Sequence, residues 1–400
     1  MQKIESKIDD TENKAAIVGE VISGRQAFSK VLRREDNSYV AVSFGEPIHY
    51  QDDNGDWHDI DNTLVETQNE DGQTVFKNTA DDISIELPLS FDDGPVRVEK
   101  DDLSVSFKIQ GKVKRSSANV LNTKEYGNDK SSKKQRASDW VKLERQSSVA
   151  RYCDVLSNTD IEYNVTPGRV KESIILKKAS KKQVKYTFEV MTKGLKAKLQ
   201  PDNSIEFITR LKDEIEFIIP SPFMFDSSAD QEFSKDIDVT LDETGEGFYT
   251  MTYSLSQEWL NDTARVYPVT IDPTICQTRT IQFVRDTYIR QKAPDTNYYT
   301  SQSLRTATSA HADGLSKALV AAFHYPMVSS MTATKIELCV KSINPVPENN
   351  NNYLKAYQIM ENWYPGLVSW NTQPSVSPNA LDCVPLCEDM RLDLTNCISD

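Results

Sequence analysis

The stretch from Arg151 to Leu176 reads RYCDVLSNTDIEYNVTPGRVKESIIL and carries the strand and turn signals that indicate the fold. Every second residue from Ile161 to Val165 is apolar, which is the pattern of a half-buried strand. The segment Thr166–Arg169 contains Pro-Gly and predicts a type II turn, because proline fixes its own φ and glycine accepts a positive φ. The run Val170–Leu176 then returns as a second strand. These features predict a β-hairpin in the middle of a larger sheet.

Short strand patterns separated by turn residues continue on both sides of this hairpin. They begin at Ile17, and the pair Asn54–Gly55 predicts a type I′ turn followed by a strand from Trp57 to Leu64. After the hairpin, the lysine-rich segment Lys177–Lys182 has the composition of a charged hairpin end. Regular short strands without intervening helices predict an all-β fold of β-sandwich domains in tandem.

Composition divides the chain into domains and connections. Residues 1–16 are charged and lack a strand pattern, which predicts a disordered segment or a short helix. Residues 17–275 are predicted to form one β-domain, interrupted by a flexible basic loop at residues 122–145. The domain closes with a strand bracketed by Pro268 and Pro273, because proline cannot donate within a ladder. Residues 276–400 are then the second β-sandwich.

Charge and hydropathy exclude several classes of protein. A net charge of −14 over 400 residues argues against nucleic acid as a partner. No apolar run is long enough to span a membrane, and Met1–Asp10 holds no apolar stretch of the signal-peptide kind. Either export uses another route or the true N-terminus is missing from this chain. The six cysteines are too sparse for a disulfide scaffold, and whether Cys383 and Cys387 pair is left open.

The sequence carries no catalytic or metal-binding motif. It lacks Gly-x-Ser-x-Gly, His-Glu-x-x-His and a phosphate-cradling glycine loop. Asp52, Asn54 and Asp56 have the spacing of calcium ligands, but Trp57 and Thr63 stand where an EF-hand loop needs glycine and glutamate. A plain hairpin turn is therefore favoured there. We predict no catalytic residue, no metal site and no cofactor.

The four histidines are scattered along the chain at His49, His58, His311 and His324. His49 and His58 flank one predicted turn and could face each other across it. A metal or catalytic role needs a third group, and the sequence names none. Structural or surface roles are favoured.

Aromatic residues after Ile275 carry the one ligand hypothesis. Sugars stack on flat aromatic rings through their apolar C–H faces, while polar groups bind their hydroxyls. Tyr298 and Tyr299 lie in a polar loop, and Trp363 and Tyr364 precede a Pro-Gly turn. These residues are predicted to form a glycan-binding platform. The alternative is that they pack in the core or in turns.

Several stretches resemble a known family. Tyr39–Leu64, Tyr152–Leu176 and Tyr267–Thr274 resemble, in the same order, the N-terminal region of bacterial Rhs-repeat and wall-associated proteins. Asp286–Ile289 and Val368–Pro374 resemble parts of the DNRLRE domain, a β-sandwich that is similar to carbohydrate-binding modules. On this resemblance residues 276–400 are a DNRLRE-like domain that is incomplete at its C-terminus.

The resemblance implies a secreted or cell-surface bacterial protein of the polymorphic-toxin kind. In such proteins these modules serve anchoring, display or glycan binding, ahead of Rhs repeats in the same protein. The expected partner is a cell-wall or extracellular polysaccharide, and the chain is expected not to be an enzyme. The alternatives are an accessory part of a secreted polysaccharide-degrading enzyme and a purely structural spacer.

Overall fold

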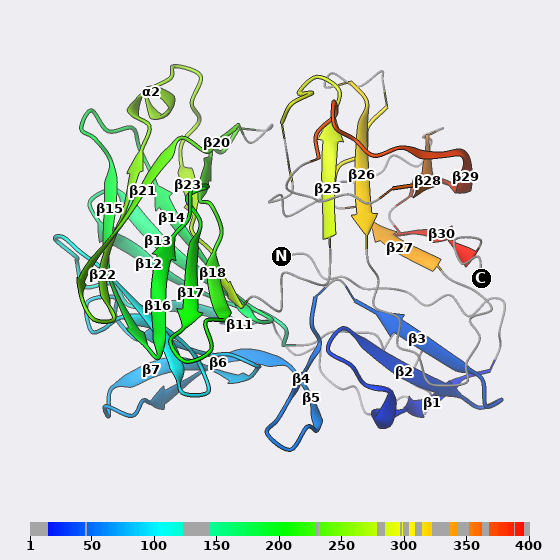
Figure 1. Cartoon of the computed structure of the whole chain (residues 1–400), viewed down its shortest axis with the longest axis horizontal. Helices are drawn as coiled ribbons and strands as arrows, with labels where there is room; N and C mark the ends of the chain where they lie inside the picture. The colour runs from blue at the N-terminus through cyan, green and yellow to red at the C-terminus, as the bar shows by residue number, and fades with distance from the viewer. Residues whose placement is uncertain are drawn as a thin grey trace.

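The computed structural model describes residues 15–44, 46–122, 145–228, 232–277, 285–296, 298, 304–308, 314–321, 337–342, 352–361, 368–387 and 389–395. Within these ranges the chain is built almost entirely of short strands, which confirms an all-β fold of tandem β-sandwich domains. Figure 1 shows a large sandwich in one half of the molecule and several smaller sheets in the other half.

The first sheet of the sandwich has eight strands in the order β21-β22-β15-β10-β9-β8-β7-β6. The bounds, in that order, are Ile237–Gly245, Phe248–Leu255, Lys185–Lys193, Leu103–Ile109, Val96–Lys100, Ser84–Pro88, Thr74–Ala80 and Asp61–Gln68. Neighbouring strands pair antiparallel throughout this sheet.

The second sheet has eleven strands, eight of them in the order β11-β12-β13-β14-β24-β18-β17-β16. Their bounds are Asn119–Asn122, Ser148–Leu156, Thr159–Thr166, Arg169–Leu176, Ile275–Gln277, Ile215–Ile219, Ile205–Thr209 and Leu195–Leu199. The remaining three are β23 (Val269–Asp272), β19 (Phe223–Phe225) and β20 (Phe233–Ser234), which extend the sheet beside β14.

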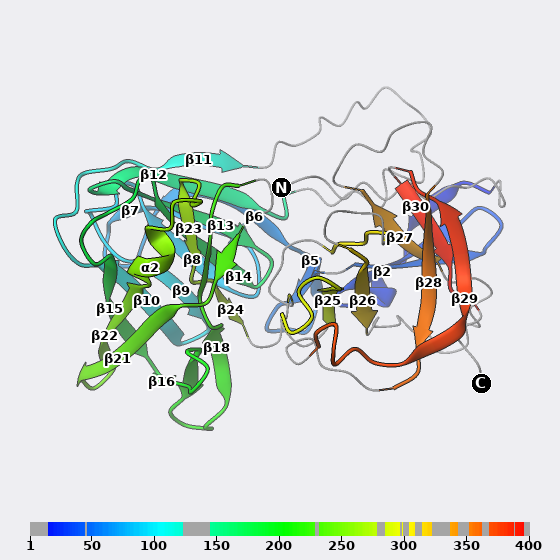
Figure 2. The same cartoon turned by 90° about the horizontal axis from the view of Figure 1, so that it is seen from above.

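The smaller elements lie outside these two sheets. One sheet is β1-β2-β3 (Ile17–Glu20, Ser29–Arg34, Tyr39–Ser43), and the two-stranded sheets are β4-β5 (His49–Gln51, Trp57–Asp59), β25-β26 (Arg285–Arg290, Ser316–Ala321), β27-β30 (Glu337–Lys341, Asp389–Asp393) and β28-β29 (Tyr353–Ile359, Val376–Pro385). The short helices are η1 (Ile22–Gly24) and α2 (Gln257–Leu260). Both views place β1–β3 in the same half of the molecule as the C-terminal strands (Figure 1, Figure 2).

The main hydrophobic core lies between the two large sheets. Phe207 on β17 is fully buried and meets Phe107 of β10 edge-on, with ring centroids 6.2 Å apart. Tyr152 of β12 is also fully buried, and its hydroxyl donates to the carbonyl of Pro88 on the opposite sheet at 2.5 Å. Because a buried tyrosine hydroxyl needs a partner, such bonds fix the two sheets relative to each other as well as filling the core.

The predicted central hairpin is confirmed. β13 pairs with β14 in unbroken register from Thr159 opposite Leu176 to Thr166 opposite Arg169. Gly168 has φ of 64°, the positive value that the Pro-Gly turn requires of its second residue. Both strands have further strands hydrogen-bonded beside them, so the hairpin lies inside the sheet as expected.

The predicted type I′ turn at Asn54–Gly55 is wrong, although the hairpin itself forms between β4 and β5. A type I′ turn needs positive φ at both central residues, and only Gly55, at 83°, has it. The Asp52 carboxylate accepts from the backbone N–H groups of Asn54 and Asp56 at 3.0 and 2.9 Å. This side chain organises a longer turn, which the dipeptide alone does not reveal.

Two other expectations are corrected by the sheet topology. The strand predicted from Trp57 to Leu64 is interrupted at Ile60, so β5 pairs with β4 while β6 joins the sandwich. The Lys177–Lys182 segment is no hairpin end, because β14 and β15 belong to different sheets. Charge on a connection indicates exposure to solvent, but it does not say which sheet the next strand joins.

The predicted domain limits remain a prediction, and strands lie near both of them. β1 begins at Ile17 as expected, and β23 occupies the positions between Pro268 and Pro273. β24, which pairs within the sandwich sheet, extends to Gln277 and so crosses the proposed limit at residue 275 by two residues. Residues 1–14 and 123–144, which hold most of the predicted N-terminal segment and basic loop, lie outside the described residues.

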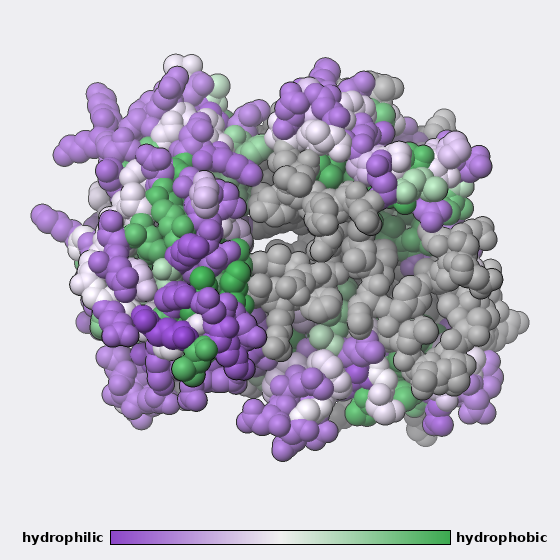
Figure 3. All heavy atoms as spheres, in the orientation of Figure 1, coloured by the Kyte–Doolittle hydropathy of each residue, from purple (hydrophilic) through white to green (hydrophobic). Residues whose placement is uncertain are grey.

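The surface agrees with the acidic, polar composition. Figure 3 shows hydrophilic residues over much of the coloured surface of the sandwich in this view, with smaller hydrophobic areas between them. In the described part of the chain, no helix has the length and apolar character needed to cross a membrane.

Glu172 on β14 is a carboxylic acid enclosed in the sandwich. Its side chain accepts a hydrogen bond from the Tyr163 hydroxyl at 2.5 Å, and it borders a cavity of about 20 Å³ with Tyr253. Burial raises the pKa of Glu172 to about 7, and the nearby charge of Asp272 acts in the same direction. The folded state therefore holds this proton more tightly than the unfolded state does.

We expect Glu172 to make the protein less stable as the pH rises from about 4.5 to about 7, because folding retains a proton that the unfolded chain releases. The loss is about 3 kcal/mol of unfolding free energy. Urea unfolding across this pH range should show that the unfolding free energy of the wild type falls relative to that of Glu172→Gln. Glu243→Gln, at an exposed position of β21, is the matched control. A constant difference between wild type and Glu172→Gln over this range contradicts the prediction.

Candidate functional site

The residues after the sandwich form a block around the strand pair β25-β26. Ile289 on β25 and Leu319 on β26 are buried together with Val368, and Ile359 and Trp370 pack against them. Because side chains alternate across a strand, Tyr288 and Arg290 leave β25 on the face opposite Ile289. The block thus has its own small core on one face and an aromatic residue with an arginine on the other.

Tyr298 lies on this second face and is almost completely buried, with 7% of its surface exposed. Its ring stacks on Tyr288, with centroids 4.3 Å apart and planes 18° from parallel. Phe233 of β20 contacts it edge-on at 5.8 Å, and the Arg290 guanidinium lies 5.8 Å from the ring centre. One face of Tyr298 is therefore covered by protein, and the residue joins the C-terminal block to the sandwich. These contacts favour the packing alternative for this tyrosine.

The other three predicted platform residues, Tyr299, Trp363 and Tyr364, lie outside the described residues. The glycan platform named from the sequence therefore remains a prediction.

Trp370 is half-buried and belongs to a turn that closes over β26. The Lys317 ammonium lies 5.0 Å from the centre of its ring and donates to Gln373 Oε1 at 2.7 Å. Gln373 in turn donates to the carbonyl of Trp370 at 2.7 Å. A cation held over an indole face in this way stabilises the turn. Trp370 therefore packs against β26 and within its own turn.

An exposed polar pair lies beside this turn. The Asn371 side chain donates to Asp295 Oδ1 at 2.8 Å, and its backbone N–H donates to the carbonyl of Pro294 at 3.0 Å. Both side chains are exposed, so they could also bind the hydroxyl groups of a ligand.

Sequence reasoning missed a second aromatic surface of the same block. On β28, Tyr353 and Tyr357 are 61% and 42% exposed. Aromatic residues on a strand normally lie on the face that the rest of the protein covers. The signal was present in the sequence as tyrosines on either side of Lys355 with a spacing of two. The sequence does not tell which face of the strand is covered, so the exposure of these tyrosines could not be predicted from it.

The two histidines within the described residues, His49 and His58, do not assemble a site. His49 lies opposite Asp59 on the neighbouring strand, and His58 lies opposite Tyr50. The two histidines therefore belong to neighbouring pairs and lie on opposite faces of the hairpin. His49 is buried and bonds the Gln26 carbonyl through Nδ1 at 2.8 Å, while exposed His58 bonds the Asp52 carboxylate. His311 and His324 lie outside the described residues.

Around His49 the charges form a structural network rather than a metal centre. Arg25 contacts Glu20 through two nitrogens at 2.7 and 3.0 Å, and His49 Nε2 lies 3.3 Å from Asp59 Oδ1. The contact with His49 lowers the pKa of Asp59. These contacts hold the β4-β5 hairpin against β1–β3. Within the described ranges, no group of three or more His, Cys, Asp or Glu side chains is placed to hold a metal ion.

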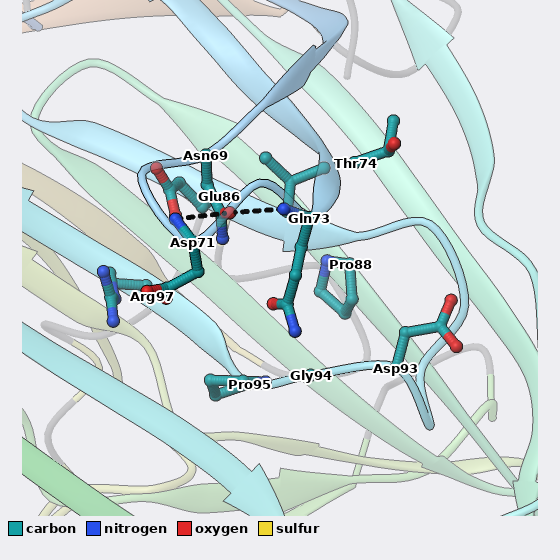
Figure 4. Close-up of a pocket in the computed structure, with 11 residues that line it drawn as sticks. Asn69, Asp71, Gln73, Thr74, Glu86, Pro88, Asp93, Gly94, Pro95 and Arg97 are labelled. Carbon is teal, nitrogen blue, oxygen red and sulfur yellow. Dashed lines mark hydrogen bonds between the residues drawn. The ribbon is translucent and has the colours of Figure 1, made fainter.

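A small polar pocket lies on the sandwich between the β6-β7 turn and the segment Asp93–Pro95 (Figure 4). Asn69 Oδ1 accepts from the backbone of Asp71 and Gln73 at 3.1 and 2.9 Å, and Arg97 lines the pocket. Its volume is about 50 Å³, whereas small-molecule sites usually enclose about 300 Å³ or more. The pocket is therefore too small to hold a sugar ring with its substituents.

Comparison with known proteins finds a family of carbohydrate-binding modules that matches the C-terminal block. Residues 277–398 match CBM96, described as carbohydrate-binding module family 96. Most of the chain is also similar to larger bacterial proteins. It is 26% identical over 373 residues to the tRNA3(Ser)-specific nuclease WapA of Bacillus spizizenii and 25% identical to the tRNA nuclease WapA of Bacillus subtilis.

These alignments cover 89% of this chain but only 15% of each relative. The chain thus corresponds to a small part of the relatives' length. No solved structure was found to match it. The resemblance found in the sequence is supported at the level of a WapA-like region followed by a carbohydrate-binding module.

Proposed function

We propose that this chain is a non-enzymatic, glycan-binding module of a secreted or cell-surface bacterial protein. The match of residues 277–398 to a carbohydrate-binding module family is the observation that carries the proposal. The proposed ligand of the module is a cell-wall or extracellular polysaccharide.

The activity named for the relatives is proposed to lie outside the segment represented here. The alignment reaches only 15% of each relative, and a net charge of −14 disfavours binding to the phosphate backbone of RNA. In this proposal residues 276–400 are the DNRLRE-like module, and the chain anchors or displays a larger protein that continues into Rhs repeats. The chain itself neither cleaves glycans nor cleaves RNA.

The test is to incubate the purified chain with insoluble bacterial cell walls and with plant polysaccharides, and then to measure depletion from solution and new reducing ends. We expect depletion by at least one polysaccharide and no new reducing ends, and intact tRNA in a parallel incubation. Serum albumin is the control for unspecific adsorption.

Each contrary outcome selects a different function. New reducing ends identify an accessory or catalytic part of a polysaccharide-degrading enzyme, and cleaved tRNA identifies a nuclease. If no polysaccharide depletes the chain, the proposal of glycan binding fails and a structural spacer is the better description.

A further inference from the structure

The strand pair β28-β29 presents a face with unusual exposed aromatic residues. Tyr353, Lys355 and Tyr357 alternate along β28 with the less exposed residues Leu354 and Ala356. Because side chains alternate across a strand, the first three share one face. Tyr353 and Tyr357 keep 61% and 42% of their surface exposed, so part of each residue is open to solvent.

The opposing strand leaves these rings open. Tyr353 lies opposite Pro385, Lys355 opposite Cys383, and Tyr357 opposite Ala380. These partners are small or compact, and all three are exposed. They form a low, apolar floor beside the tyrosines, so no long side chain of β29 stands directly opposite either ring.

Lys355 gives this face a positive charge. The neighbouring acid, Asp382, lies opposite Ala356 and so belongs to the other face, where its two oxygens accept from the backbone N–H groups of Cys383 and Asp393 at 2.7 Å each. Lys355 is exposed and lies between the tyrosines with three donors available for ligand oxygens. In both views β28 and β29 lie on the side of the molecule away from the sandwich (Figure 1, Figure 2).

We propose that Tyr353, Lys355 and Tyr357 form the surface on which an extended polysaccharide lies. The proposal rests on the proposed glycan-binding function and names its site. The two tyrosines are four residues apart, about 13 Å along a strand. That span is longer than one sugar ring, so the two rings contact different sugars of one chain. The site therefore binds internal sugars of a linear polymer, with Lys355 donating to oxygens between them.

The test compares wild type with the double variant Tyr353→Ala and Tyr357→Ala by affinity electrophoresis in gels that contain a polysaccharide bound by the wild type. Loss of two stacking contacts should weaken binding by about tenfold or more. Replacing both tyrosines by phenylalanine keeps the rings and should keep most of the affinity. Tyr39→Ala is the matched control, because Tyr39 is 45% exposed but lies on β3, outside residues 277–398.

Two further comparisons sharpen the result. Monosaccharides should not compete with the polymer, whereas longer oligosaccharides should. Neutral and acidic polymers are tested side by side. Lys355→Ala should lower affinity for an acidic polymer more than for a neutral one. Thermal unfolding should be nearly unchanged in the double variant, because both positions are exposed.

The outcomes separate this proposal from the one on which it rests. If the wild type binds no polysaccharide, glycan binding itself is refuted together with this site. If the wild type binds and the double variant binds equally well, only the assignment to β28 is overturned. Equal competition by a monosaccharide would instead refute the extended ligand.

Discussion

Replacing Phe207 by alanine is expected to lower the free energy of unfolding by about 3–5 kcal/mol. Phe207 is fully buried on β17 and contacts Phe107 of the facing sheet. Removing the ring takes away buried apolar surface and leaves a cavity between two sheets that cannot close completely. Chemical denaturation followed by tryptophan fluorescence or circular dichroism measures the change.

The control is four residues further along the chain. Leu211 is 97% exposed in the turn after β17, so Leu211→Ala should change stability by less than about 0.5 kcal/mol. A cost below about 1 kcal/mol for Phe207→Ala would contradict the two-sheet core described above.

The second large effect is expected from Arg265→Ala, at about 3–5 kcal/mol of unfolding free energy. The side chains of Arg265 and Asp226 are 7% and 0% exposed and meet at 2.9 Å. The guanidinium also lies 3.5 Å from the centre of the Trp259 ring. Without the arginine, a buried carboxylate keeps its backbone bonds but loses the charge that compensates it.

The pH dependence gives this prediction a second readout. Burial alone would raise the pKa of Asp226, but hydrogen bonds from Ser228, Val266 and Arg265 outweigh burial and lower it. A lowered pKa means that the carboxylate contributes stability above its unfolded pKa and loses that contribution as the pH falls through the folded value. Arg265→Ala should therefore reduce the acid-induced loss of stability.

An exposed ion pair serves as the comparison for Arg265. Lys196 and Asp213 contact each other with side chains that are 46% and 76% exposed. Lys196→Ala should cost less than about 1 kcal/mol, because solvent screens an exposed pair. Equal costs for Lys196→Ala and Arg265→Ala would show that burial does not decide the strength of these contacts.

Local patterns predicted the elements of the fold well. The central hairpin, the positive φ of Gly168 and the strand between Pro268 and Pro273 all follow from residues that are neighbours in the sequence. Period-2 alternation and turn residues act within a few positions, so a reader of the sequence can see them directly.

The errors have a common cause. The turn at Asn54 is shaped by the Asp52 side chain, and β14 and β15 belong to different sheets although they follow each other in the sequence. Neither property can be predicted from the residue pattern of one strand. At the candidate site, the ring of Tyr298 contacts Tyr288, ten residues earlier, and Phe233 of the sandwich, and the sequence around Tyr298 does not show the second contact.

The sequence by itself determined that the chain forms short antiparallel strands, where its central hairpin turns, and that its C-terminal part resembles a carbohydrate-binding module. Only the tertiary structure decided which strands share a sheet and which aromatic residues remain exposed. The reason is physical: the alternation of side chains is a local property, whereas exposure depends on what the rest of the chain places over each face. Tyr298 and Tyr353 are both tyrosines of the same block, yet one is 7% exposed and the other 61%.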